Sequence, residues 1–131
     1  MDRKKLLLRL AYLILFIFII NSLAMKFYWY FTIWYFDMPM HFLGGFWLGL
    51  LLIWFFRIDK VSPRLIFKIS LGVLLIGVSW EVFEFWANNF IGQIPFSIPD
   101  TLSDIFFDLA GGLSAVFFYL KRNTLVLGKL L

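Results

Sequence analysis

The chain has 131 residues, of which 63% are hydrophobic and 22% aromatic, and its mean hydropathy is +0.90. A water-soluble domain of this size needs far more polar surface, whereas apolar runs of about eighteen residues or more are typical of transmembrane helices. The composition therefore predicts an integral membrane protein, with residues 1–131 forming a single transmembrane domain. The absence of cysteine excludes disulfides, thiolate metal ligands and a cysteine nucleophile.

Four apolar segments have the length of membrane spans, at residues 6–23, 39–56, 65–90 and 102–120. The fold class expected from them is all-α, a bundle of four transmembrane helices. Aromatic side chains occupy eight of the ten positions at 27–36 (FYWYFTIWYF). Trp and Tyr concentrate at the membrane–water boundary, so this segment predicts an interfacial belt, with a platform for stacking carbohydrate or lipid as the alternative. Residues 91–103 carry the Gly and Pro of a loop.

The start of the chain has a second interpretation. Residues 1–24 combine a basic beginning, an apolar stretch and a final Ser-Leu-Ala, the pattern of a cleavable signal peptide. The apolar run is long for such a peptide, which favours a membrane span. Cleavage stays open as the alternative, and it would leave the orientation of the later spans unchanged.

The basic residues predict the orientation of the bundle. Of the 12 Lys and Arg residues, all but Lys26 lie near span ends that share one face of the membrane. They are Arg3, Lys4, Lys5, Arg9, Arg57, Lys60, Arg64, Lys68, Lys121, Arg122 and Lys129. Basic residues mark the cytoplasmic side, so both termini are expected in the cytoplasm, in a multi-pass protein of the inner (cytoplasmic) membrane. This topology accounts for the net charge of +4, and no nucleic acid is expected as a partner.

Six of the eight acidic residues and the only histidine are expected at the outer ends of three spans. They are Asp37 and His41 in the second span, Glu81 and Glu84 in the third, and Asp100, Asp104 and Asp108 in the fourth. Spacings of three or four residues place neighbours on one helix face. Charged side chains facing lipid are costly, so these faces should point into the bundle and meet there.

Several of these residues also have purely structural explanations. Asp37, followed by Pro39, suits a helix N-cap, and Thr101 with Asp104 matches a capping box. Asp100 is expected in a turn. A lone histidine is usually a hydrogen-bonded core residue. Glu81, Glu84 and Asp108 lie too deep for capping, so their structural alternative is a buried polar network that fixes helix register.

Clustered carboxylates in a medium of low dielectric constant have to share protons, pair with a cation or bind a metal. Carboxylates with one imidazole and no thiol suit Mg²⁺, Mn²⁺, Ca²⁺ or Zn²⁺. The candidate metal ligands are Asp37, His41, Glu81, Glu84, Asp104 and Asp108, and the candidate catalytic acid/base residues are Glu81, Glu84 and Asp108. Such a metal could activate water or polarise a phosphoryl group of a membrane lipid or lipid-linked substrate of the cell envelope. Whether the protein is an enzyme stays open.

Two other classes of function fit the same residues. A chain of carboxylates and a histidine could serve a proton- or cation-coupled transporter, and the acidic faces could instead contact a second subunit, including a second copy of this chain. Transport needs a polar path to the cytoplasm, yet the inner halves of the last three spans contain little polar beyond Lys68, Ser70 and Ser114. The sequence therefore favours a one-sided site.

Small residues predict which spans pack closely. Gly45-x-x-x-Gly49 in the second span and Gly111-x-x-x-Ala115 in the fourth are small-xxx-small patterns, which let helix backbones approach each other. We expect these two spans to be in contact near the acidic residues.

Three motifs in order resemble the VanZ-like superfamily of small bacterial membrane proteins, over residues 37–115. They are D-x-x-x-H-F-x-x-G from Asp37, W-E-x-x-E from Trp80, and D-x-x-x-D-x-x-x-D-x-x-G-G from Asp100. Glu84 and Asp108 depart from the glutamine and asparagine usual in the VanZ branch, which includes a teicoplanin-resistance protein. They resemble the YjdF-type branch instead and argue against the resistance role. The resemblance implies a multi-span membrane fold and carries no catalytic roles.

Overall fold

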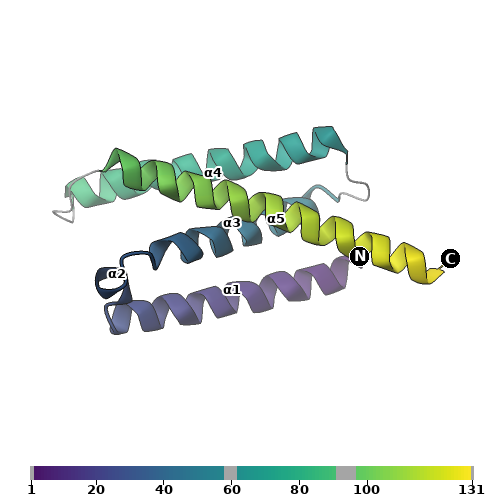
Figure 1. Ribbon diagram of the computed structural model, residues 1–131, viewed down its shortest axis with the longest axis horizontal. Helices are drawn as coiled ribbons and strands as arrows, with labels where there is room; N and C mark the ends of the chain where they lie inside the picture. Colours follow the sequence, from purple (N-terminus) through teal and green to yellow (C-terminus); the bar gives the residue numbers. More distant parts are fainter. Residues whose placement is uncertain (1, 58–61, 91–96, 131) are drawn as a thin grey trace.

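The computed structural model describes residues 2–57, 62–90 and 97–130, which contain helices and no strand. Four long helices lie side by side (Figure 1), and each is long and apolar enough to cross a membrane. They are α1 (Arg3–Lys26), α3 (Asp37–Phe55), α4 (Pro63–Phe90) and α5 (Ile98–Leu130), and the short α2 (Trp29–Thr32) lies within the aromatic segment. The prediction of an all-α bundle with four spans is confirmed. The loop residues Asp59, Lys60, Gly92 and Pro95 lie outside the described ranges.

Side-chain caps mark the starts of α1, α4 and α5. The side chain of Asp2 accepts a hydrogen bond from the Lys4 amide (3.3 Å) at the start of α1. Ser62 precedes Pro63 at the start of α4, and its hydroxyl accepts a hydrogen bond from the Leu65 amide. Ser97 precedes α5 in the same way, and its hydroxyl accepts a hydrogen bond from the Asp100 amide. Because Ser97 caps α5, this helix begins before the expected residue 102, and residues 98–103 are helical instead of forming a loop.

The interface between α3 and α5 is the most extensive in the bundle. A Cβ atom on Gly45 would meet the backbone of Asp108, and one on Gly111 would meet the backbone carbonyl of Phe42. One turn further along, a Cβ on Gly49 would lie 2.8 Å from that of Ala115. The absence of side chains at these positions allows the two backbones to approach, as the small-xxx-small patterns predict.

The two ends of the bundle differ in composition. α1 begins and α5 ends at the same end, which we call the terminal end, and α2 lies at the opposite end, the α2 end (Figure 1). The buried apolar core lies toward the terminal end, where Leu50, Ile53, Ile69 and Val73 are at most 2% exposed. Large apolar side chains cover the outside of the bundle, as expected of a surface in contact with lipid.

α1 packs mainly against α3. The Trp47 indole of α3 donates a hydrogen bond to the backbone oxygen of Leu10 (2.9 Å), and Arg3 donates to that of Trp54 (2.8 Å). Both bonds lie in the half of α1 nearer the terminal end. They fix α1 on α3 at that end, and a space between α1, α3 and α4 opens further toward the α2 end.

Candidate functional site

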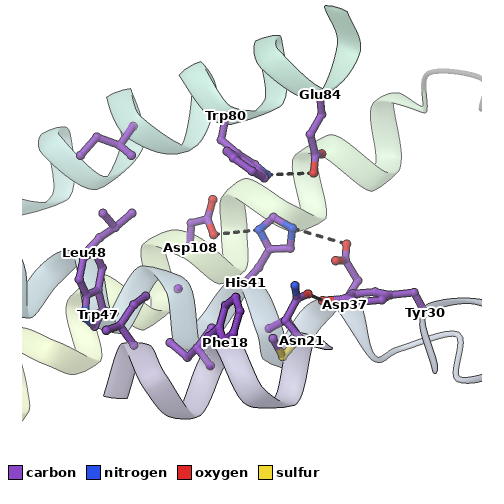
Figure 2. Close-up of a pocket in the computed structure, with 15 residues that line it drawn as sticks. Phe18, Asn21, Tyr30, Asp37, His41, Trp47, Leu48, Trp80, Glu84 and Asp108 are labelled. Carbon is purple, nitrogen blue, oxygen red and sulfur yellow. Dashed lines mark hydrogen bonds and ion pairs between the residues drawn. The ribbon is translucent and has the colours of Figure 1, made fainter. Parts of the chain in front are cut away.

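One imidazole joins three carboxylates from two helices at the α2 end. Nδ1 of His41, on α3, lies 3.0 Å from Oδ1 of Asp108 on α5. Nε2 lies 3.4 Å from Oδ1 of Asp104 and 3.5 Å from Oδ2 of Asp37. Figure 2 shows His41 between Asp108 on one side and Asp37 on the other. Both ring nitrogens of His41 therefore contact carboxylates, Nδ1 on one side of the ring and Nε2 on the other.

Three glycines, which have no side chain, make this arrangement possible. The approach of α3 to α5 at Gly45 and Gly111 brings Asp108 within reach of the ring of His41. On α4, a Cβ atom at Gly77 would lie 2.8 Å from Oδ2 of Asp108, so this glycine provides space for the carboxylate. The glycines thus serve the polar site as well as helix packing.

α4 contributes two further carboxylates from the sequence WEVFE. Glu84 accepts a hydrogen bond from the Trp80 indole (2.9 Å), and both side chains point toward His41 from α4 (Figure 2). Glu81 is 8% exposed, and its Oε1 atom has no hydrogen-bond partner among the described residues. One ligand atom from each of Glu81, Glu84 and Asp104 falls within 4.8 Å of the others. The same holds for Asp37, His41 and Asp104.

The histidine–carboxylate cluster therefore consists of Asp37, His41, Glu81, Glu84, Asp104 and Asp108. These are the six residues predicted as metal ligands, and helix periodicity with topology sufficed to place them together. Asp100 differs, because it is exposed in the first turn of α5 and belongs to neither group of candidate ligands.

The capping roles considered for Asp37 and Asp104, and the turn expected at Asp100, are wrong. Asp37 is the first residue of α3, after Phe36 as N-cap, and no side chain caps this helix. Asp104 is 3% exposed and lies in the second turn of α5, where backbone N–H groups are already paired within the helix. Asp100 is helical instead of lying in a turn, because the helix begins at Ile98.

The cluster carries excess negative charge. Within the described ranges, the ion pairs of its carboxylates all involve His41, and none involves a lysine or arginine. Asp104, Asp108 and Glu81 are each less than 9% exposed. Buried carboxylates without cationic partners are costly, so the cluster needs protons or bound cations.

A cavity of about 710 Å³ lies beside the cluster between α1, α3 and α4 and opens to the outside of the bundle, where its lining residues Ile14, Phe18 and Ile76 are 41–63% exposed. Its polar lining consists of Asn21, Tyr30, Asp37, His41, Glu84 and Asp108. Its apolar lining includes Ile14, Ile17, Phe18, Trp47, Leu48 and Ile76. Glu81 and Asp104 do not line it and lie behind the cavity wall. The cavity is therefore amphipathic, with one charged region and one apolar region.

Tyr30 and Asn21 belong to this site although the sequence did not identify them. The Tyr30 hydroxyl donates a hydrogen bond to Oδ1 of Asn21 (2.6 Å), which ties α2 to the end of α1. Burial raises the pKa of Tyr30, and the negative charges of Asp37 and Glu84 raise it further. The available signal was Asn21 itself, a polar amide at the end of an apolar run.

The geometry around His41 suits a divalent cation. Ligand atoms about 2.0–2.1 Å from a tetrahedral metal lie roughly 3.3–3.4 Å apart. The distances from Nε2 to Asp104 and Asp37, 3.4 and 3.5 Å, are close to this spacing. Histidine ligands commonly donate their other N–H to a carboxylate, which is the position of Asp108 at Nδ1. Asp37, His41 and Asp104 could thus hold a metal, with Asp108 orienting the ring.

The fold and this cluster define a polytopic membrane protein with ionisable groups buried among its helices. Residues 2–124 match the family described as "Predicted membrane protein (DUF2238)", and the chain belongs to that family. No curated protein and no solved structure matches it.

Proposed function

We propose that this protein binds a membrane lipid bearing a phosphoryl headgroup, with the headgroup at the histidine–carboxylate cluster and the hydrocarbon chain in the apolar part of the cavity. The observation that carries the proposal is the continuity of the cavity, which contacts His41 and Glu84 as well as Ile14 and Ile17. Lipids combine the same two chemistries in one molecule. A volume of about 710 Å³ also lies within the range of roughly 300–1,000 Å³ usual for small-molecule sites.

A bound divalent cation would allow an acidic site to bind an anionic headgroup. Carboxylates alone repel phosphate, whereas a cation held by Asp37, His41 and Asp104 would present positive charge to it. Mg²⁺, Mn²⁺, Ca²⁺ and Zn²⁺ all accept oxygen ligands, and the imidazole favours Mn²⁺ or Zn²⁺ over the other two. His41 and Asp37 line the cavity, so such a cation would be within reach of the lipid.

The site also has the groups needed to process the headgroup. When bound, a divalent cation supplies Lewis acidity to a phosphoryl oxygen. Glu84 lines the cavity and could take a proton from water or give one to a leaving oxygen. Of the three residues predicted as acid/base groups, Glu84 and Asp108 line the cavity and Glu81 does not. Asp108 is engaged with Nδ1 of His41 as a positioning residue, which leaves Glu84 as the proposed acid/base group.

The proposal also includes the orientation of the protein in the membrane and its relation to a larger family. Among the residues that the structure describes, Lys and Arg near helix ends lie at the terminal end, apart from Lys26 at the α2 end. We therefore assign the terminal end, with both termini, to the cytoplasm, and the cluster to the outer leaflet of the inner membrane. Its ligand would then be a lipid or lipid-linked intermediate of the cell envelope. The three motifs resemble those of the YjdF-type branch of VanZ-like proteins, and we propose that the chain is related to that branch.

The transport alternative has less support. The core toward the terminal end is closed by Leu50, Ile53, Ile69 and Val73, and a polar path toward the cytoplasm would have to cross it. Ion or proton flux through reconstituted vesicles would reverse this preference.

Lipid binding can be tested by native mass spectrometry of the protein released from nanodiscs. With Mn²⁺, we expect retention of phosphatidic acid, loss of retention with a chelator, and loss in His41→Ala. Asp100→Asn, on the same acidic end but outside the cluster, should retain lipid like the wild type. Equal retention of phosphatidic acid by the wild type and His41→Ala would refute the proposal. Preferential retention of a positively charged lipid, with or without Mn²⁺, would also refute it.

A further inference from the structure

Asp104 belongs to two groups of potential metal ligands. With Asp37 and His41 it forms the group discussed above, and with Glu81 and Glu84 it forms a second. The first group connects α5 to α3, and the second connects α5 to α4. A carboxylate has two oxygens and can bind a different cation through each of them. Asp104 is the residue that the two groups share, as a bridging ligand would be.

The second group contains a buried oxygen that lacks a partner. Glu81 is 8% exposed, and Oε1 forms no hydrogen bond to any residue the structure describes. An unsatisfied buried carboxylate oxygen is costly, and buried charges are normally paired or bound to metal. One carboxylate oxygen of Glu81 lies within 4.8 Å of oxygens of Glu84 and Asp104. A cation bound by these three residues would neutralise the buried carboxylate to which the unpartnered Oε1 belongs.

Charge balance favours two cations over one. The two groups together contain four carboxylates and one imidazole. Asp108, whose Oδ1 lies 3.0 Å from Nδ1 of His41, is the fifth carboxylate of the cluster. Two divalent cations offset four of the five negative charges, with the imidazole neutral. A single divalent cation would leave three negative charges among the helices, and these would require protons.

We propose that the cluster is a dinuclear divalent-metal centre, with Asp37 and His41 on one ion, Glu81 and Glu84 on the other, and Asp104 bridging the two. The inference rests on the cation site of the proposed function and deepens it. Two adjacent cations can stabilise both the attacking and the leaving oxygen in phosphoryl chemistry. The substrate class is then a phosphate ester or anhydride of a lipid. Hydrolysis would form a P–O bond from water and break the P–O bond to the leaving group. The proton would pass from the attacking to the leaving oxygen through the Glu84 oxygen that does not bind the ion.

Metal stoichiometry tests the centre without reference to activity. Protein in nanodiscs is loaded with Mn²⁺, desalted and analysed for bound manganese per chain. We expect two Mn²⁺ in the wild type and in Asp100→Asn, and one in Glu81→Gln. Glu84→Gln provides a second variant of the same ion site on the cavity wall, so the test does not depend on tolerance of one buried substitution.

Electron paramagnetic resonance adds a measurement that a structural role would not change. Two bridged Mn²⁺ ions should give an exchange-coupled spectrum, and Glu81→Gln should restore the sharp hyperfine pattern of an isolated ion. One Mn²⁺ per chain in the wild type, or none, would overturn the dinuclear centre. If lipid retention still required Mn²⁺ in that case, the proposed lipid binding would stand without the dinuclear centre. Two coupled ions with no lipid retention would instead refute the lipid function alone.

Discussion

Replacing Gly45 with alanine should separate the two helices that hold the site. A Cβ atom at this position would lie 2.7 Å from both the carbonyl carbon and the Cα of Asp108. Carbon atoms in ordinary contact are roughly 3.5–4.0 Å apart. The obstructing atoms belong to the backbone and cannot rotate away. α3 and α5 would therefore have to move apart by about 1 Å at this level.

That movement has a structural and a chemical consequence. Overpacking of this kind costs about 1–3 kcal/mol, equivalent to between about 5-fold and 150-fold in the equilibrium constant for unfolding. The distance from His41 Nδ1 to Asp108 Oδ1, now 3.0 Å, would also exceed the normal hydrogen-bond range. His41 would then lose the contact that orients it, and loss of such a contact typically weakens metal affinity about 10- to 100-fold.

Gly44→Ala is the matched control for Gly45→Ala. Nothing lies within 4 Å of the Cβ position at Gly44, so this variant has the same gain in helix propensity without the clash. Unfolding in mixed micelles of increasing SDS content, together with Mn²⁺ titration, measures both consequences. If the two variants unfolded at the same SDS fraction and bound Mn²⁺ equally well, the close approach of α3 and α5 at the cluster would be refuted.

Three further predictions concern single side chains. In an ultraviolet alkaline titration, Tyr30→Phe should remove a tyrosine whose pKa lies above the ordinary range, and loss of a tyrosine with an ordinary pKa would contradict this. Because folding raises the pKa of Tyr30, the stability of the folded wild type should fall as the pH rises through that raised pKa. Asp108→Ala removes the acceptor for Nδ1 of His41 and should weaken Mn²⁺ binding about 10- to 100-fold, whereas Asp100→Ala should not. Equal affinities would exclude a role for Asp108 in orienting the ring. Trp80→Phe should destabilise the protein by about 0.5–1.5 kcal/mol in the same SDS titration by removing the 2.9 Å bond to Glu84, and wild-type stability would show that this bond contributes nothing.

The membrane fold was predictable because its signals are long and local. Apolar runs identified the four spans, and helix periodicity placed Glu81 with Glu84 and Asp104 with Asp108 on shared faces. Topology then brought three helices to the same depth. The resulting prediction of six clustered ligands needed no knowledge of side-chain conformation, because any arrangement that hides charge from lipid would bring them together.

Capping and the cavity were not predictable for different physical reasons. Ser97 and Thr101 both suit the start of a helix, and nothing in the sequence shows which one ends the preceding loop. The cavity depends on how α1 rests on α3, which the Trp47–Leu10 hydrogen bond helps to fix between residues distant in the sequence. Asn21 and Tyr30 became part of the site only through that packing.

Photocrosslinking from α1 tests the central claim, that the cavity holds the chain of a phosphoryl lipid. Benzoylphenylalanine is placed at Ile17, which lines the cavity, or at Ile19, which is 48% exposed on the outside of the same helix. Mass spectrometry after irradiation in mixed-lipid nanodiscs identifies the adducts. We predict that position 17 captures phosphatidic acid selectively and only with a divalent cation, while position 19 captures the bulk lipids in proportion. Identical adducts at both positions, unchanged by chelation, would contradict the account.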